Sequence, residues 1–537
     1  MEKIKTHETG AQTPRNDEDN MGLGEVTDVL NASGHKQELE RNFNLLSICS
    51  IGITTGNVWA ALGGSVVIAL YNGGPPGVIY EFIVVCCFYF MIAACIAEMA
   101  SAIPSSAGVY HWASVTGGRY GRSLGFFSGW WNFFGWIFNS ASMSSILANQ
   151  VISMYGLFHP GYEYERWHVF MAFLIINWAC CFLVMFANRA LPIVTNIGLF
   201  LILIGVFITI MVCAIMPSQK LGGHGHASSD FVWKEWQNQT GWESNGLVFC
   251  MGMLNGAYAV GTPDCVSHLA EELPNPRVNI PKALLAQYAV GFITALLYII
   301  TIFYSVNDLD SLFSNPWPFP LAELYRQATG SHAGAMGLLI VIFLPTVCTN
   351  IGGMITAGRM LWTLGRDDAT PFSKWVGHID KRFQNPLNAT LVCGCINTLL
   401  GCIYVGNTTA FSAFVGSFIV LSTASFLAFL VPHIITRRRH VAPGPFRMPD
   451  VVFYPVAILA CGYMMVFIVI YFFPYAVPFT AASMNYSCLI VGGLSLFVAG
   501  WWFYIRGRGY IGPHGVVEDA VRSASVQGGR ASFAEKE

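Results

Sequence analysis

An acidic side chain, Asp264, occurs inside an otherwise apolar block, in the stretch GAYAVGTPD (residues 256–264). A carboxylate in such a block is costly, so it marks a candidate functional site. Three roles are open to it: a counter-ion for a substrate amine, a proton carrier, or a structural partner that holds the chain in shape. His268 follows at i+4, where it can couple to the carboxylate or simply form a hydrogen bond.

Glycines and a proline near Asp264 predict a break in the helix. Pro263 has no N–H, so the carbonyl of Ala259 loses its helical partner, and glycine allows the backbone to leave helical geometry. The first apolar block has a similar interruption, GITTGN (residues 52–57). Exposed backbone N–H groups at such breaks attract a carboxylate, and free carbonyls attract an ammonium group. Two matching breaks therefore indicate a site for a zwitterion, whereas one alone would equally suit a proline kink between packed helices.

Two further carboxylates and an aromatic cluster lie in the apolar blocks. Glu98, near one end of the second block, suits a salt bridge or an inner gate, and Glu81, at the opposite end, is expected to reach the membrane interface. The aromatics of GWWNFFGW (129–136) suit a core or a cavity wall, and Tyr258 and Trp59 adjoin the breaks. The fifteen cysteines lie nearly all in apolar blocks and show no CxxC spacing, so we expect no metal and no cofactor.

The blocks that carry these residues predict an all-α integral membrane protein. Of 537 residues, 54% are hydrophobic and only 11% are charged, with a mean hydropathy of +0.52. Residues 1–43 and 506–537 read as cytoplasmic tails, the first of them disordered, around a transporter domain at 44–505. The twelve predicted spans are 44–71, 77–102, 122–155, 167–188, 190–216, 246–271, 281–306, 334–365, 387–405, 410–436, 452–473 and 484–505.

The distribution of Lys and Arg predicts the orientation of these spans. With the N-terminus inside, the outer segments contain Arg166, Lys220, Lys234 and Arg326, which leaves 24 of the 28 basic residues inside. Such an excess is typical of cytoplasmic loops. We therefore expect both termini in the cytoplasm. The two breaks lie about five spans apart, which indicates two halves of opposite topology, 44–216 and 246–436, followed by two further helices at 452–505.

Three motifs resemble those of the amino acid–polyamine–organocation permeases. HLAEELPNPRVNIPKAL (268–284) resembles the end of that superfamily's sixth helix, AGRMLWTLGRDDATPFSKW (357–375) its eighth-helix signature, and IPSSAGVYHWAS (103–114) the loop after its second helix. The long tail and the GTPD break look most like the fungal amino acid/choline transporters, which include permeases for choline and γ-aminobutyrate. The resemblance implies a five-plus-five inverted repeat with broken helices one and six, alternating access, and a substrate held between those two helices.

The resemblance also implies which residues meet the substrate and the coupling ion. Ile53 to Gly56 would meet a carboxylate, and Ala257, Tyr258, Ala259 and Asp264 would lie beside an amine. No Lys occurs in 190–216, where some bacterial relatives use one in place of sodium, so we expect a proton, carried by Asp264, His268 or Glu98. The predicted substrate-binding residues are Ile53, Thr54, Thr55, Gly56, Asn57, Gly256, Ala257, Tyr258, Ala259, Gly261 and Asp264.

These observations predict a secondary active importer of a small amine-bearing metabolite. An amino acid such as γ-aminobutyrate suits the open backbone and hydroxyls of GITTGN, and choline or a polyamine is the alternative substrate. A membrane nutrient sensor that binds without transport is the alternative from another class. No catalytic set occurs at either membrane face, so we expect no enzyme. The plasma membrane is the expected location, with the vacuolar membrane as the alternative.

Overall fold

The described part of the chain is almost entirely α-helical, as the sequence predicted. The structure is a computed structural model that describes residues 44–513 except 160, 219–224, 316, 381, 407–409, 479, 482 and 483. The predicted tail at 1–43, and the predicted C-terminal tail from 514 onward, lie outside the described residues.

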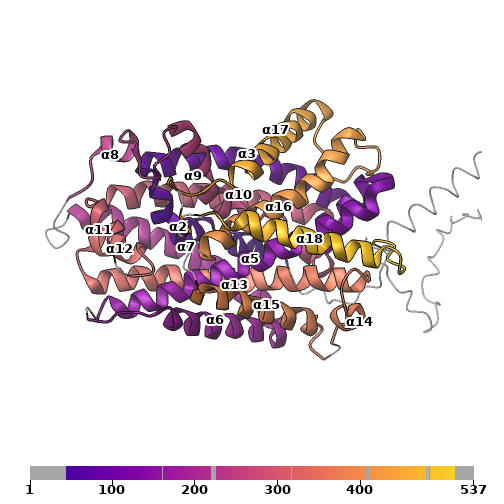
Figure 1. Ribbon diagram of the computed structural model, residues 1–537, viewed down its shortest axis with the longest axis horizontal. Coiled ribbons are helices and arrows are strands. Elements are labelled where there is room, and N and C mark those ends of the chain that lie inside the picture. The colour runs from indigo at the N-terminus through magenta and orange to yellow at the C-terminus, as the bar shows by residue number, and fades with distance from the viewer. Residues whose placement is uncertain are drawn as a thin grey trace, which may run out of the picture.

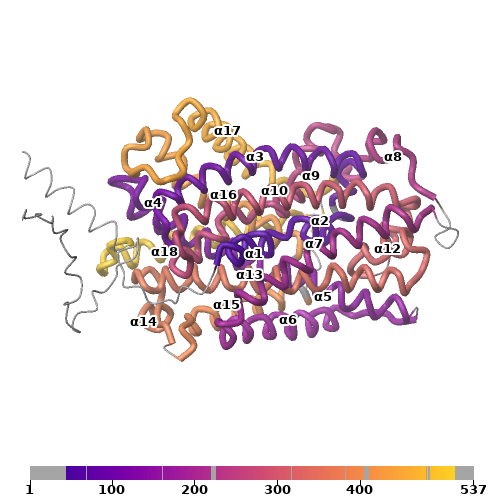
Figure 2. Tube along the Cα trace, turned by 180° about the vertical axis from the view of Figure 1, so that it is seen from behind, coloured from indigo at the N-terminus to yellow at the C-terminus, as the bar shows by residue number. Residues whose placement is uncertain are grey.

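Long helices lie side by side along one axis and form a bundle (Figures 1 and 2). α8, α11 and α12 lie at one end of it, here called the α8–α12 end, and α4 and α14 lie at the other, the α4–α14 end. The helices are α1 (Leu45–Thr55), α2 (Val58–Leu70), α3 (Gly74–Ala102), α4 (Val109–Thr116), α5 (Gly121–Gly156), α6 (Arg166–Phe186), α7 (Leu191–Ile215), α8 (Ser229–Trp233), α9 (Asn245–Val260), α10 (Pro276–Tyr304), α11 (Leu309–Phe313), α12 (Leu321–Thr329), α13 (His332–Arg366), α14 (Ser373–Val376), α15 (Leu387–Gly406), α16 (Ala410–Ile435), α17 (Asp450–Ile470) and α18 (Ser487–Ile505), with 3₁₀ turns η1 (Gly118–Tyr120), η2 (Asn188–Ala190), η3 (Met216–Ser218) and η4 (Ser267–Glu272).

Every predicted span coincides with helix, but not every helix is long and apolar enough to be counted as membrane-crossing. In the described residues, nine helical segments meet that description. α9 has only 16 residues because a break ends it at Val260, and the apolar part of α15 is also short, Leu387–Ile403. α5 is long but contains many Asn and Ser residues, which lower its hydropathy. The protein is thus an integral membrane protein, and the exact twelve-span count and the inverted repeat stay predictions.

α5 and α13 form the centre of the bundle, and α6, α7, α17 and α18 form its periphery. α5 packs against α4, α13 and α16, and most of its side chains are buried. The peripheral helices expose large apolar side chains, for example Ile193 and Phe200 of α7 and Leu496 of α18. Such surfaces suit contact with lipid acyl chains, because apolar side chains need no hydrogen-bond partner in the bilayer.

A short β-ladder ties the two broken helices together at the α8–α12 end. β1 (Asn72–Gly73) follows α2 and pairs antiparallel with β2 (Gln237–Asn238), which precedes α9. Gly73 has φ +125°, and a Cβ there would lie 2.5 Å from the Trp236 ring. Only glycine therefore fits at this turn.

Candidate functional site

The first predicted break is present between α1 and α2. α1 ends at Thr55, where the Gly56 N–H closes the last turn on Gly52 O at 2.9 Å, and α2 begins at Val58. A Cβ on Gly56 would lie 2.4 Å from Gln287 Nε2 and 3.0 Å from Thr262 Oγ1. The missing side chain thus allows this break to touch both α10 and the second break.

The second predicted break follows α9, and two side chains of α10 cover the backbone that it exposes. α9 ends at Val260, whose carbonyl accepts a hydrogen bond from Tyr288 Oη at 2.7 Å. Gln287 Nε2 donates to Thr262 O and Thr262 Oγ1, each at 3.1 Å. Since Pro263 prevents a regular helical turn, these donors replace the missing intrahelical ones. The sequence analysis did not identify Gln287 and Tyr288, although adjacent polar residues in an apolar span were a visible signal.

Asp264 is enclosed by protein side chains. Its Oδ2 accepts from Asn132 Nδ2 at 2.6 Å and from Trp136 Nε1 at 3.2 Å, both on α5. His268 Nε2 lies 3.1 Å from the same oxygen, and His268 Nδ1 lies 3.0 Å from the carbonyl oxygen of Ser106. Asp264 is 1% exposed and His268 is fully buried. The two residues are thus in direct contact, as both the coupling and the simple hydrogen-bond readings of His268 require, and the motif GWWNFFGW supplies the other two donors.

The remaining predicted site residues are buried, and several have protein partners. Tyr258 Oη lies 2.8 Å from Ser142 Oγ, and Thr54 Oγ1 donates to Thr195 O at 3.2 Å. A Cβ on Gly256 would lie 3.3 Å from the backbone of Phe82, so close packing against α3 suits this glycine. Ile53, Ala257, Ala259 and Gly261 are also buried.

Around the first break, several buried polar groups have no partner among the described residues. They are Thr55 Oγ1, both side-chain atoms of Asn57, and Trp59 Nε1. Thr55 points toward α13, because a Cβ on Gly352 would lie 2.2 Å from its hydroxyl. A buried donor without an acceptor is costly, so a ligand that accepts hydrogen bonds would be stabilised here.

Glu98 lies in a separate ion cluster and does not meet Asp264 or His268. Its carboxylate pairs with Arg438 and accepts from the Met448 N–H at 2.9 Å. Arg438 also pairs with Asp450 at 2.9 Å. This cluster ties α3 to the segment between α16 and α17, which suits the gate reading of Glu98 better than a role beside the breaks.

The two recognised motifs pair with each other through buried charges. Arg359 Nε of α13 lies 2.7 Å from Glu272 Oε1, and Arg366 Nη1 lies 3.2 Å from Glu271 Oε1. Arg359 is fully buried and also donates to Asn385 Oδ1 at 2.6 Å. The turn after the second break is thereby fastened to α13. Paired and hydrogen-bonded charges of this kind are costly to disrupt.

Residues 43–494 match the family model described as amino acid permease. The chain belongs to the amino acid permease family. This permease is 29% identical to the choline transporter of Saccharomyces cerevisiae over 88% of its own length and 83% of that protein. It is 26% identical to the 7-keto 8-aminopelargonic acid transporter of the same yeast, over 86% and 92%. It is 26% identical to a putative amino acid/polyamine transporter of Macrophomina phaseolina, over 80% and 94%.

The family match confirms the resemblance seen in the three motifs, and fungal relatives confirm its fungal character. The family and these relatives are transporters, which supports a permease rather than an enzyme.

Proposed function

We propose that this permease is a secondary active importer of a small amino acid, with γ-aminobutyrate as the model substrate. The observation that carries the proposal is the set of unpartnered donors beside the first break, Thr55 Oγ1, Asn57 Nδ2 and Trp59 Nε1. Hydroxyl, amide and indole N–H groups all donate to a carboxylate. A substrate carboxylate at this break would therefore offer an acceptor to donors that have no partner among the described residues.

The names of the relatives support a substrate with an amine. One is a choline transporter, and another is a transporter of 7-keto 8-aminopelargonic acid, an amino acid by its name. Since the Asp264 carboxylate is already contacted by three side chains, we assign the amine of the substrate to the carbonyls and aromatic rings of the breaks, such as Tyr258, rather than to Asp264.

A proton is the proposed coupling ion, and the Asp264–His268 pair is its proposed carrier. A carbonyl oxygen only accepts, so His268 Nδ1, which faces Ser106 O, carries a hydrogen. The contact between Nε2 and Asp264 Oδ2 then needs a second proton. We propose that the contact between Nε2 and Oδ2, on which the donors of Asn132 and Trp136 also converge, is where the coupling proton binds and leaves.

Alternating access is proposed to open and close the two ends of the bundle in turn. In this proposal the buried ion pairs of Arg359, Arg366 and Arg438 hold the α4–α14 end closed. With both termini in the cytoplasm, as the basic residues predict, this is the inner gate of a plasma-membrane importer.

Uptake of labelled γ-aminobutyrate tests the proposal, in cells that lack endogenous permeases and at several external pH values. We expect accumulation that rises as the external pH falls, and competition by other amino acids. Binding without accumulation would identify a sensor instead. Accumulation that does not respond to pH but responds to sodium would refute proton coupling while sparing the transporter assignment.

Choline is the second candidate substrate, favoured by the similarity to the yeast choline transporter. Choline has no carboxylate, so it would leave the donors of Thr55, Asn57 and Trp59 unpaired. Substituting Thr55 by Val distinguishes the two substrates. We expect this variant to lose γ-aminobutyrate uptake but to keep any choline uptake.

A further inference from the structure

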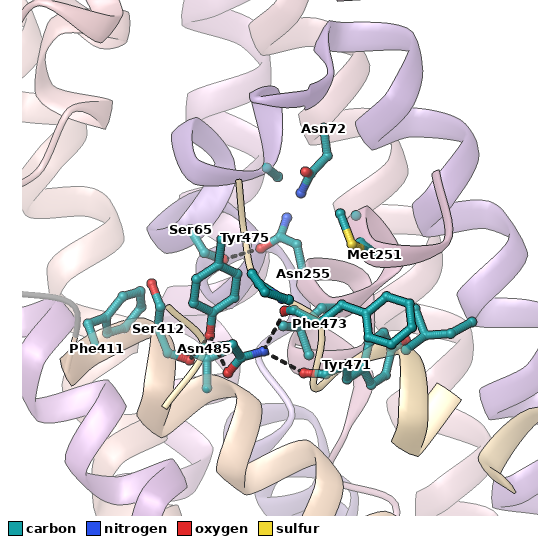
Figure 3. Close-up of a pocket in the computed structure, with 16 residues that line it drawn as sticks. Ser65, Asn72, Met251, Asn255, Phe411, Ser412, Tyr471, Phe473, Tyr475 and Asn485 are labelled. Carbon is teal, nitrogen blue, oxygen red and sulfur yellow. Dashed lines mark hydrogen bonds between the residues drawn. The ribbon is translucent and has the colours of Figure 1, made fainter. Parts of the chain in front are cut away.

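A pocket lies between the two broken helices, away from the breaks and toward the α8–α12 end. Residues of α2, α9 and α16, the turn after α17 (Tyr471, Phe473, Pro474 and Tyr475) and Asn485 line it (Figure 3). Ser65 lies nine residues after Gly56, and Asn255 lies six residues before Gly261. At about 1.5 Å per helical residue, the pocket is roughly 9–14 Å from the breaks along the same two helices. It therefore lies on the route between the breaks and the end that we expect to face outside.

Hydrogen bonds hold the walls of this pocket in place. Asn485 Nδ2 donates to Tyr471 O at 2.7 Å and to Phe473 O at 3.1 Å. Tyr475 Oη donates to Ser412 O at 3.1 Å, and its ring, like that of Phe473, lines the pocket (Figure 3). Ordered aromatic rings favour an organic cation, because the face of each ring carries partial negative charge.

A buried carboxylate without a partner in the described part of the chain lies behind one wall of the same pocket, against the lining residue Gly252. Glu81 of α3 is 2% exposed, and neither of its oxygens has a hydrogen-bond partner in the described part of the chain. A Cβ on Gly252 would lie 2.3 Å from both oxygens, so the carboxylate lies against the bare backbone of a residue that lines the pocket.

The sequence analysis expected Glu81 to reach the membrane interface. The structure instead buries its carboxylate between α3 and α9. A buried carboxylate with no partner is expensive. The cost falls when a cation binds beside it, and the aromatic walls exclude a strongly hydrated metal ion in favour of an ammonium group attached to an apolar body.

We propose that this pocket is a second, outer binding site for a small organic ammonium compound, with Glu81 as its counter-charge and the rings of Phe473 and Tyr475 around its apolar part. The side of the membrane that it faces rests on the proposed function. The site holds the substrate before it reaches the breaks. A substrate that is a zwitterion has a donor for its carboxylate here too, because Asn255 Nδ2 has no partner among the described residues.

Equilibrium binding to the purified full-length protein tests this proposal, with labelled γ-aminobutyrate and labelled choline as separate probes. For the probe that is transported, we expect two bound molecules per chain in the wild type and one in Glu81→Gln. We also expect Glu81→Gln to raise the KM of uptake about tenfold with little change in kcat, as for the loss of one charge-assisted contact. Gly252→Ala should act in the same way, because its Cβ displaces the carboxylate.

The exposed carboxylate of Glu163 is the matched control, and Glu163→Gln should bind two molecules. If the wild type transports a probe but binds one molecule, or if Glu81→Gln binds as many as the wild type with the same affinity, the outer site is wrong and the proposed function stands. If neither probe binds or is transported, both proposals are wrong.

Discussion

Replacing Asp264 by Asn should uncouple transport from the proton gradient. The amide has the shape of the carboxylate, and its oxygen still accepts from Asn132 and Trp136, so the fold around the second break is kept. What it removes is the negative charge beside His268. Without that charge, the Asp264–His268 contact can no longer act as the proposed proton carrier.

The size of this effect follows from the burial of the pair. His268 is 0% exposed and Asp264 is 1% exposed, so solvent screens neither charge. Removing one partner of a buried, hydrogen-bonded pair costs about 3–5 kcal/mol. At about 1.4 kcal/mol for each factor of ten, this cost corresponds to roughly a 10²- to 10⁴-fold loss of proton-coupled transport. Cys265 and Tyr288, the other titratable groups near Asp264, cannot replace the charge, because both are neutral near pH 7.

Proteoliposomes with an imposed pH gradient provide the assay. We expect Asp264→Asn and His268→Gln to lose gradient-driven accumulation by about 10²-fold or more but to retain substrate exchange without a gradient. Asp230→Asn is the control, because Asp230 forms an exposed pair with Lys234 at 2.6 Å and lies outside the site. Wild-type accumulation by the Asp264→Asn variant would remove the pair from the coupling mechanism.

Three further substitutions test the way in which the breaks are held. Gly56→Ala should abolish uptake, because its Cβ would lie 2.4 Å from Gln287 Nε2; uptake at the wild-type rate would show that Gln287 is free to move. Tyr288→Phe should lower the free energy of unfolding by about 1–3 kcal/mol, because the last carbonyl of α9 loses its donor; an unchanged thermal midpoint of the purified protein would contradict this. Arg359→Met should destabilise the protein by about 3–5 kcal/mol, because it leaves a buried carboxylate unpaired, and the amount of folded, monodisperse protein in detergent measures the loss.

Much of the fold could be predicted from the sequence, because the determinants are local. The apolar blocks predicted where helices run, and each block is helical. The breaks after Thr55 and Val260 were also predictable, since glycine and proline act on the adjacent backbone. The interaction that the sequence suggested between Asp264 and His268 is a contact at i+4, within reach along a single segment of chain.

Partners that come from distant segments could not be predicted in this way. Asn132, which donates to Asp264, is 132 residues away from it in the sequence. Nothing in the sequence around Glu81 indicates that its carboxylate packs against Gly252. The sequence by itself determined a helical membrane protein with two broken helices, through hydropathy and backbone chemistry that act over a few residues. Only the tertiary structure decided which buried charges are paired and which are open to a ligand, because that depends on which helices pack together and how closely their side chains meet.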